Sequence, residues 1–190
     1  MATRFESTLE PKKDKELDWN DFLICSTNYP RFTDNFVDET LAEISYGKAL
    51  SVQWKLQNPF LYSTPTSECS LCEYRVAKTF PQNSTYLGQW KGEKRHGRGT
   101  QLTFDSAGAA VSVYEGYWSD DLRNGQGRSV TKEGDSYLGR WKKGTVFGEG
   151  KKVWVNGDSF KGTFVDGKCN GFGVKTWADG SSYSGHWQNN

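Results

Sequence analysis

A short motif that returns at a nearly fixed interval constrains this chain more than any other feature. It consists of an aromatic residue, any residue, glycine, any residue and a second aromatic residue, and its successive starts lie 28, 23, 23 and 23 residues apart. The copies occupy Tyr86–Trp90, Tyr114–Trp118, Tyr137–Trp141, Phe160–Phe164 and Tyr183–Trp187. Such a period is typical of a repeat architecture, in which each unit packs mainly on its neighbours.

Two further patterns keep the same period. A Gly-x-Gly sequence follows each of the first four copies, and a turn sequence such as Asn156-Gly157 or Asp179-Gly180 closes each unit. These two pairs are the strongest short hairpin signals, because both residue types tolerate a positive φ. Twenty of the 21 glycines lie after residue 85, whereas all five prolines lie before it. Proline removes a hydrogen-bond donor from a sheet, so the second half of the chain suits continuous strands.

Side-chain alternation predicts how each unit is built. The two rings and the glycine of Tyr-x-Gly-x-Trp are two residues apart, so all three face one side of a strand. The glycine leaves room for a ring from a neighbouring strand, and Gly-x-Gly offers two more such gaps. We therefore predict a mainly β fold, an elongated single-layer antiparallel sheet of stacked β-hairpin repeats that cover one another's rings.

These motifs resemble the MORN repeat (membrane occupation and recognition nexus), with four full units and a fifth half-unit. The resemblance implies an extended sheet, often with a groove for a partner's helix or extended segment, and roles in cytoskeletal, ciliary and membrane-junction assemblies. Two departures stand out. A five-residue insertion around Ala107–Ala110 should bulge or lengthen one loop, and Phe160 and Phe164 replace tyrosine and tryptophan in the fourth unit.

The array is predicted to span residues 73–190, with a degenerate edge-capping unit at 73–85 and repeats that start at 86, 114, 137, 160 and 183. Residues 1–72 are predicted to form an irregular N-terminal arm that contains one or two short helices. The clearer helix lies near 34–46, where Val37, Leu41 and Ile44 make an apolar stripe. We favour an anchoring arm, held by the repeat sheet or by a partner, over a self-contained subdomain.

The residues that carry chemistry are sparse, so no catalytic residue and no cofactor is predicted. Cys69 and Cys72 have the spacing of half a zinc site, but no second pair of ligands follows, and structural thiols are favoured. His96 occupies a repeat position that Asn124 and Asn170 fill elsewhere. That interchange indicates a hydrogen bond that supports a turn, and argues against a general base.

The charge and hydropathy of the sequence limit the cellular location and the kinds of partner that we expect. The net charge is +1, which gives no drive towards nucleic acid, and the start of the chain has no apolar signal segment. A cytoplasmic protein is therefore expected. Basic residues cluster in the first unit and are candidates for lipid contact, although a solvated edge is the favoured interpretation. The candidate lipid-binding residues are Lys91, Lys94, Arg95 and Arg98.

Two function classes follow. The first is a non-catalytic scaffold that binds other proteins, as a helix or extended segment on the sheet or as a strand at an edge, in a cytoskeletal or ciliary (axonemal) assembly. The second is an adaptor on phosphoinositide-rich membrane; a regulatory part of a larger enzyme is a weaker third. The candidate partner-binding residues form the aromatic face: Tyr86, Trp90, Tyr114, Trp118, Tyr137, Trp141, Phe160, Phe164, Tyr183 and Trp187.

Overall fold

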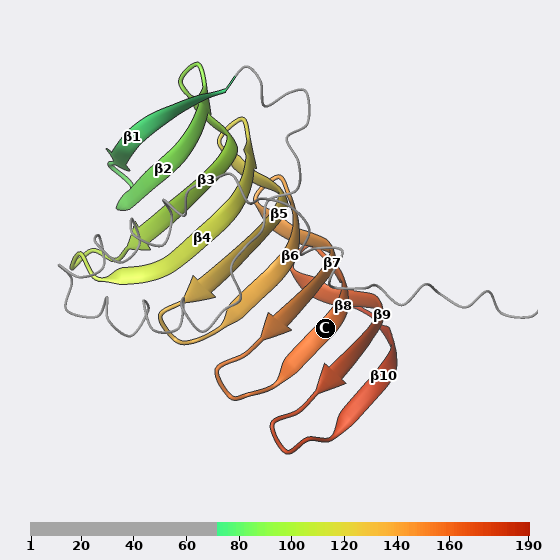
Figure 1. The fold of residues 1–190 in the computed structure, drawn as a ribbon. Coiled ribbons are helices and arrows are strands. Elements are labelled where there is room, and N and C mark those ends of the chain that lie inside the picture. The colour runs from blue at the N-terminus through green and yellow to red at the C-terminus, as the bar shows by residue number, and fades with distance from the viewer. Residues whose placement is uncertain (1–71) are drawn as a thin grey trace, which may run out of the picture.

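A computed structural model of the protein describes residues 72–190, which form one open antiparallel sheet of ten strands in chain order (Figure 1). The mainly β, single-sheet fold predicted from the repeat is thus confirmed. The strands are β1 (Glu73–Phe80), β2 (Ser84–Lys91), β3 (Lys94–Phe104), β4 (Ala110–Ser119), β5 (Leu122–Thr131), β6 (Ser136–Lys142), β7 (Thr145–Val153), β8 (Ser159–Val165), β9 (Lys168–Thr176) and β10 (Ser182–Trp187). The helix predicted near 34–46 lies outside the described residues, so it and the division into arm and array stay predictions.

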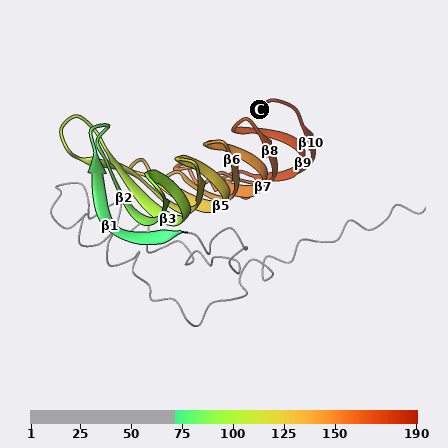
Figure 2. The same cartoon turned by 90° about the horizontal axis from the view of Figure 1, so that it is seen from above.

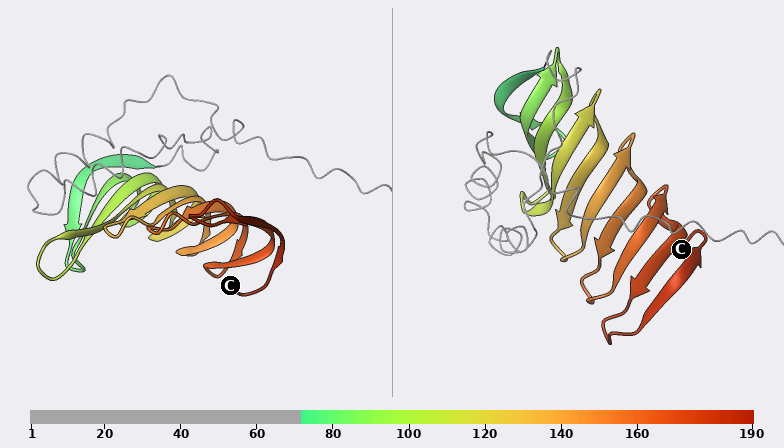
Figure 3. Two further views of the ribbon diagram at one scale, coloured as in Figure 1. Left: turned by 90° about the horizontal axis from the view of Figure 1, so that it is seen from below. Right: turned by 45° about the vertical axis from the view of Figure 1, so that its right-hand side comes forward.

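The array is elongated because each strand pairs only with the strands before and after it in the chain. Figures 2 and 3 show curved strands that follow one another along a single axis, without a second layer among residues 72–190. Strand β1 borders β2 at one edge, where the Phe80 ring stacks on Trp90 with centroids 6.1 Å apart. The edge strand therefore adds one ring to the repeat packing.

Two kinds of turn alternate along the array. Two-residue turns join the strands within a unit, and both central residues have positive φ at Lys143-Gly144 (50° and 87°) and at Asp166-Gly167 (48° and 79°). This is the type I′ turn, whose twist matches that of the flanking strands. The turns between units are longer, and at Asn156-Gly157 only the glycine has a positive φ. The tightest turns thus lie elsewhere than at the two strongest hairpin signals.

The insertion in the first unit lengthens the strands and adds a bulge at Val111, between the pairs Thr103–Ser112 and Phe104–Ala110, whereas the loop itself is not lengthened. Strand β3 has 11 residues against nine in β7 and β9, and β4 has 10 against seven in β6 and β8. The loop between β3 and β4 closes with a hydrogen bond from Asp105 N to Ala109 O (2.8 Å), as Trp154 N bonds to Asp158 O (2.9 Å) two units later. The extra residue pairs between β3 and β4 satisfy backbone hydrogen-bonding groups that a longer loop would leave exposed to solvent.

A bulge recurs in every unit and gives the Gly-x-Gly motif its shape. Between the pairs Gly88–Gly99 and Trp90–Arg95, the single residue Gln89 faces three residues of β3. The first glycine of the motif has a positive φ at each bulge: Gly97, Gly125, Gly148 and Gly171. Bulges bend a strand and strengthen its twist, which produces the curvature of the sheet.

Candidate partner-binding face

Nine glycines line up across strands β2 to β10 and form the floor of the aromatic face. Each is register-paired with the next: Gly88, Gly99, Gly116, Gly127, Gly139, Gly150, Gly162, Gly173 and Gly185. A Cβ added to Gly127 would lie 2.7 and 2.8 Å from ring carbons of Tyr114. Only glycine fits beneath these rings, because any Cβ would clash with them, and this explains the row of nine glycines.

The rings form a continuous ladder above the glycines, which confirms that the two aromatics of each motif share one side of their strand. Successive rings meet edge to face, with centroids 5.1–5.5 Å apart, a preferred geometry for aromatic pairs. Tyr86 contacts Trp90 of its own unit and Trp118 of the next. Ring contacts therefore join each unit to its successor.

The predicted packing of rings over the glycines is confirmed only in part. Each first ring covers the glycines of its own unit, as Tyr86 covers Gly88 and Gly99. From the adjoining unit it is the second ring that reaches a glycine, since the Trp118 indole bonds to Gly99 O. The first glycine of Gly-x-Gly lies beneath no ring of the ladder. A Cβ on Gly97 would instead meet the Gln89 side chain on the opposite face. The backbone rotation at the bulge separates the environments of the two glycines.

The polar tips of the ladder hold the backbone at the bulges. The hydroxyls of Tyr86, Tyr114 and Tyr137 donate to the carbonyl oxygens three residues later, at 2.9, 2.9 and 3.0 Å. Burial raises the pKa of all three tyrosines above the ordinary value, so they remain protonated donors. The Trp118 indole Nε1 likewise donates to Gly99 O at 3.1 Å.

The fourth unit lacks this hydroxyl, because Phe160 replaces tyrosine. Its ring keeps the same position, over Gly162 and Gly173. We expect Phe160→Tyr to add a hydrogen bond to Thr163 O and to raise the free energy of unfolding by about 0.5–1.5 kcal/mol. Thermal unfolding of the full chain checks this, with Phe172→Tyr on the exposed opposite face as the control. An unchanged or lowered midpoint for Phe160→Tyr contradicts the expectation.

The exposed fractions of the ten predicted partner-binding residues show which of them a partner could contact. The eight rings from Tyr86 to Phe164 are 0–8% exposed, whereas Tyr183 is 48% exposed and Trp187 is partly buried. The ladder is therefore the core of the array. A partner on this face meets mainly the side chains that lie over the ladder and the rings near β10.

Two arginines lie over the ladder in the first two units. Arg95 stacks 4.5 Å from the centroid of the Trp118 ring and bonds through Nε to Asp121 Oδ1 at 3.1 Å. Arg123 lies 4.6 Å from the Tyr114 ring centroid and 5.2 Å from that of Trp141. Both arginines are register-paired with the second aromatic of their unit. They screen this part of the ladder from solvent.

The third unit lacks the arginine, and a hollow takes its place. Val146 is paired with Trp141 at the position that Arg95 and Arg123 fill before it. The hollow is lined by apolar side chains of Tyr137, Val146 and Phe164 and by polar residues Ser129, Thr131, Asp135, Ser136 and Lys152, with Gly167. Beside it, Lys175 Nζ lies 4.0 Å over the Trp154 ring. Apolar floor and charged rim together are typical of a site that anchors a side chain.

The charges on this rim are already paired. Lys152 Nζ lies 3.9 Å from Asp135 Oδ2, and Lys175 Nζ lies 3.3 Å from Asp158 Oδ2. Burial alone would raise the pKa of Asp158, but hydrogen bonds from Ala178 N and the Lys175 ammonium outweigh it, so the pKa lies below the ordinary value. Asp158 therefore stays ionised near neutral pH, and the rim has little net charge with which to select a partner.

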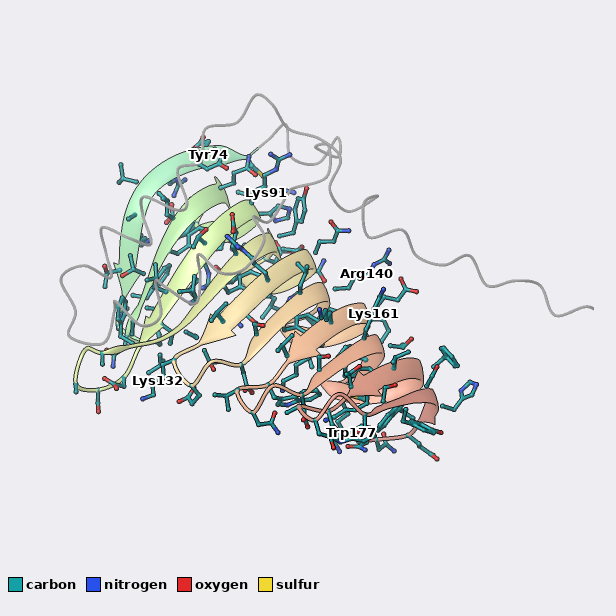
Figure 4. All side chains as sticks on the ribbon, turned by 60° about the horizontal axis from the view of Figure 1, so that its bottom comes forward. Tyr74, Lys91, Lys132, Arg140, Lys161 and Trp177 are labelled. Carbon is teal, nitrogen blue, oxygen red and sulfur yellow. The ribbon has the colours of Figure 1, made fainter. Side chains whose placement is uncertain are left out.

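The predicted lipid-binding residues do not form one patch. Lys91 and Lys94 are exposed beside a tight turn, on the edge that Figure 4 marks with Lys91. Arg95 lies on the ring ladder, and Arg98 is only 6% exposed on the opposite face. Figure 4 places Lys132 and Trp177 along the other edge, that of the longer turns. Only two of the four cations are thus open to a membrane surface.

Sequence reasoning missed Val146, Lys152, Trp154 and Lys175. A signal for Val146 was present, since aligned units carry arginine, arginine, valine and cysteine at this position. His96 and Asn124, also aligned, accept hydrogen bonds from Asp120 N (3.5 Å) and Lys143 N (3.4 Å). This agrees with the turn-supporting role predicted for that position.

Within residues 72–190, no group of three or more His, Cys, Asp or Glu side chains could hold a metal ion. Cys72 is partly buried and Cys169 is buried, whereas Cys69 lies outside the described residues, so the pairing of Cys69 with Cys72 stays untested. The same part of the chain has no helix long and apolar enough to cross a membrane.

Comparison with known families agrees with this geometry. The family model of the MORN repeat matches four segments, residues 86–104, 114–136, 137–159 and 160–182. The chain belongs to the MORN-repeat family. The matched starts are those of the first four predicted units, and the MORN ring ladder continues into β10 beyond the last match. No curated protein matches the chain. MORN repeats are non-enzymatic modules that bind proteins or membranes.

Proposed function

We propose that this chain is a non-catalytic scaffold that binds a segment of another protein on the aromatic face of its third and fourth MORN repeats. One observation carries the proposal: Val146 replaces the arginine that covers the ladder in the two preceding units, and a hollow floored by Tyr137 and Phe164 results. Units one and two show that an arginine can fill this position, whereas units three and four carry Val146 and Cys169 there, and the hollow lies at unit three.

The lining defines the kind of partner segment. An apolar or aromatic side chain fits the floor, and its flanking backbone can bond to the polar rim, as in helix-in-groove or extended-segment recognition. The rim lysines are paired with Asp135 and Asp158, so packing contributes more than net charge. Buried anchors of this kind dominate the energetics of interfaces.

Val146→Arg tests the proposal by restoring the missing cover. The new guanidinium should lie over Tyr137 and Phe164, as Arg95 and Arg123 lie over their rings, and leave the fold intact. We expect tagged full-length protein to lose its bound partner, by more than about tenfold in recovery, when an anchor of ~1.5–3 kcal/mol is excluded. Affinity purification with quantitative mass spectrometry measures this.

Thr145→Arg is the matched control, because the neighbouring residue is exposed and receives the same charge. It should leave the partner's recovery unchanged. If Val146→Arg folds, as judged by its thermal midpoint, and still recovers every partner at the wild-type level, the hollow is not the binding site.

The membrane alternative has weaker support in this geometry, because Arg95 and Arg98 are engaged or buried. Sedimentation with vesicles containing phosphoinositide distinguishes it: lipid binding should fall with added salt and with charge reversal at Lys91 and Lys94. The cytoplasmic and cytoskeletal or ciliary setting is part of the proposal, and the family resemblance alone supports it. Imaging of the tagged full chain in ciliated cells tests that part.

A further inference from the structure

The face opposite the rings carries a buried patch that the sheet itself does not explain. Six residues on β3, β4 and β5 whose side chains point away from the ladder are almost fully buried. Their exposures are 0% for Thr100, Leu102 and Val113, 3% for Glu115, 4% for Arg128 and 1% for Val130. Cross-strand pairing of Leu102 with Val113, and of Val113 with Val130, makes them one continuous patch.

An open single-layer sheet leaves the tips of such side chains in water, unless a second layer packs about 10 Å away. All ten strands of residues 72–190 lie in one sheet, so these residues supply no second layer. The same face of the sheet is less buried in the later units. Val153, in the row of Val113 and Val130, is only partly buried, and so is Val174 on β9.

The patch also holds an ion pair that requires cover. Arg128 Nε and Nη2 each lie 2.9 Å from Glu115 Oε2, and the two side chains are 5% and 4% exposed. The aligned pair is Leu138 and Lys151 in the third unit and Lys161 and Val174 in the fourth, and both lysines are exposed. The buried position thus carries two opposite charges in contact, and the exposed positions carry lysines that water can solvate, as the high cost of burying a charge requires.

We propose that the N-terminal segment of this same chain, residues 1–71, covers the patch, with the amphipathic stretch 34–46 as its main contact. That segment joins the array directly before β1, and only β2 lies between β1 and the first strand of the patch. Its stripe of Val37, Leu41 and Ile44 is apolar, as is the part of the patch formed by Leu102, Val113 and Val130.

Charge supports the same occupant. Residues 1–71 carry seven Lys and Arg against eleven Asp and Glu. The sheet face beyond the patch displays the exposed cations Arg140, Lys151 and Lys161, two of which are labelled on one side of the array in Figure 4. An acidic segment is therefore drawn to this face, whereas a second copy of the array would bring like charges together.

A charge placed in the patch should release the segment. In full-length protein, we expect Val113→Lys to speed tryptic cleavage at Arg31, Lys48 and Lys55 by about tenfold or more, because cleavage tracks the population of the open state. Val153→Lys is the matched control, being the same change in the same row outside the patch, and should alter these rates by less than about twofold. Equal rates in wild type and a folded Val113→Lys variant overturn the proposal.

A photocrosslinker keeps the test decisive if Val113→Lys fails to fold. p-Benzoylphenylalanine in place of Tyr117, a partly buried residue on the patch side of β4, should crosslink within the monomer to residues 1–71. The same amino acid at Phe172, which is 58% exposed on that face in β9, should not. Crosslinks from position 117 to a second copy, or to nothing, overturn the proposal.

Discussion

Gly127→Ala is expected to lower the free energy of unfolding by about 3–5 kcal/mol, although it adds a single methyl group. The new Cβ would lie within 2.8 Å of ring carbons of Tyr114. That ring is fully buried between Trp118 and Trp141, and it has no space into which to withdraw. The array must therefore give up the packing of Tyr114. Chemical denaturation of the full chain measures the loss.

A double-mutant cycle identifies the cause. If the clash with the ring is responsible, Gly127→Ala should cost little once Tyr114→Ala has removed the ring, and the coupling should exceed about 2 kcal/mol. Gly108→Ala is the matched control, because nothing lies within 4 Å of its Cβ; only its positive φ (81°) adds a cost of about 1 kcal/mol. Additive effects of the two substitutions contradict the steric account.

Trp118→Ala is expected to cost about 3–5 kcal/mol and to divide the array into two independently unfolding parts. Trp118 is 4% exposed and joins Tyr86 of the first unit to Tyr114 of the second. Its indole also bonds to Gly99 O and carries Arg95 on its face. Removing it opens a cavity between two units whose stability depends on that interface.

Calorimetry distinguishes the two effects: a lower midpoint reports the cavity, and a second transition reports the lost coupling. Trp177→Ala is the control, since this tryptophan is 38% exposed and lies in the turn after β9. Trp118→Phe should lose only about 1 kcal/mol, because unit four uses Phe164 at the same position. A single unshifted transition in Trp118→Ala contradicts the role of the ladder as the joint between units.

Much of the fold was predictable because its rules are local. Alternation along a strand puts Tyr137, Gly139 and Trp141 on one side whatever surrounds them, and the period sets where each unit starts. The different roles of the two glycines in Gly-x-Gly were not predictable in the same way. Gly99 lies beneath a ring and Gly97 in a bulge because β2 has one residue, Gln89, where β3 has three, which only the pairing reveals.

The candidate site was predictable only in part. The rings were expected to be a binding surface, yet they are the core, because the curved sheet and the arginines of units one and two close over them. The hollow at Val146 depends on which residue is paired with the second aromatic of each unit, and the bulge sets that register. A comparison of aligned units shows the change from arginine to valine but not the hollow that lies there.

Sequence alone determined the β repeat, its period and the side of the sheet on which the rings gather, because steric alternation and the volume of a ring act between near neighbours. Tertiary structure alone decided which rings are hidden, where the hollow lies and which part of the opposite face is buried. These features depend on curvature and on cross-strand register, which arise only when all the strands pair and the bulges in each unit bend the same sheet.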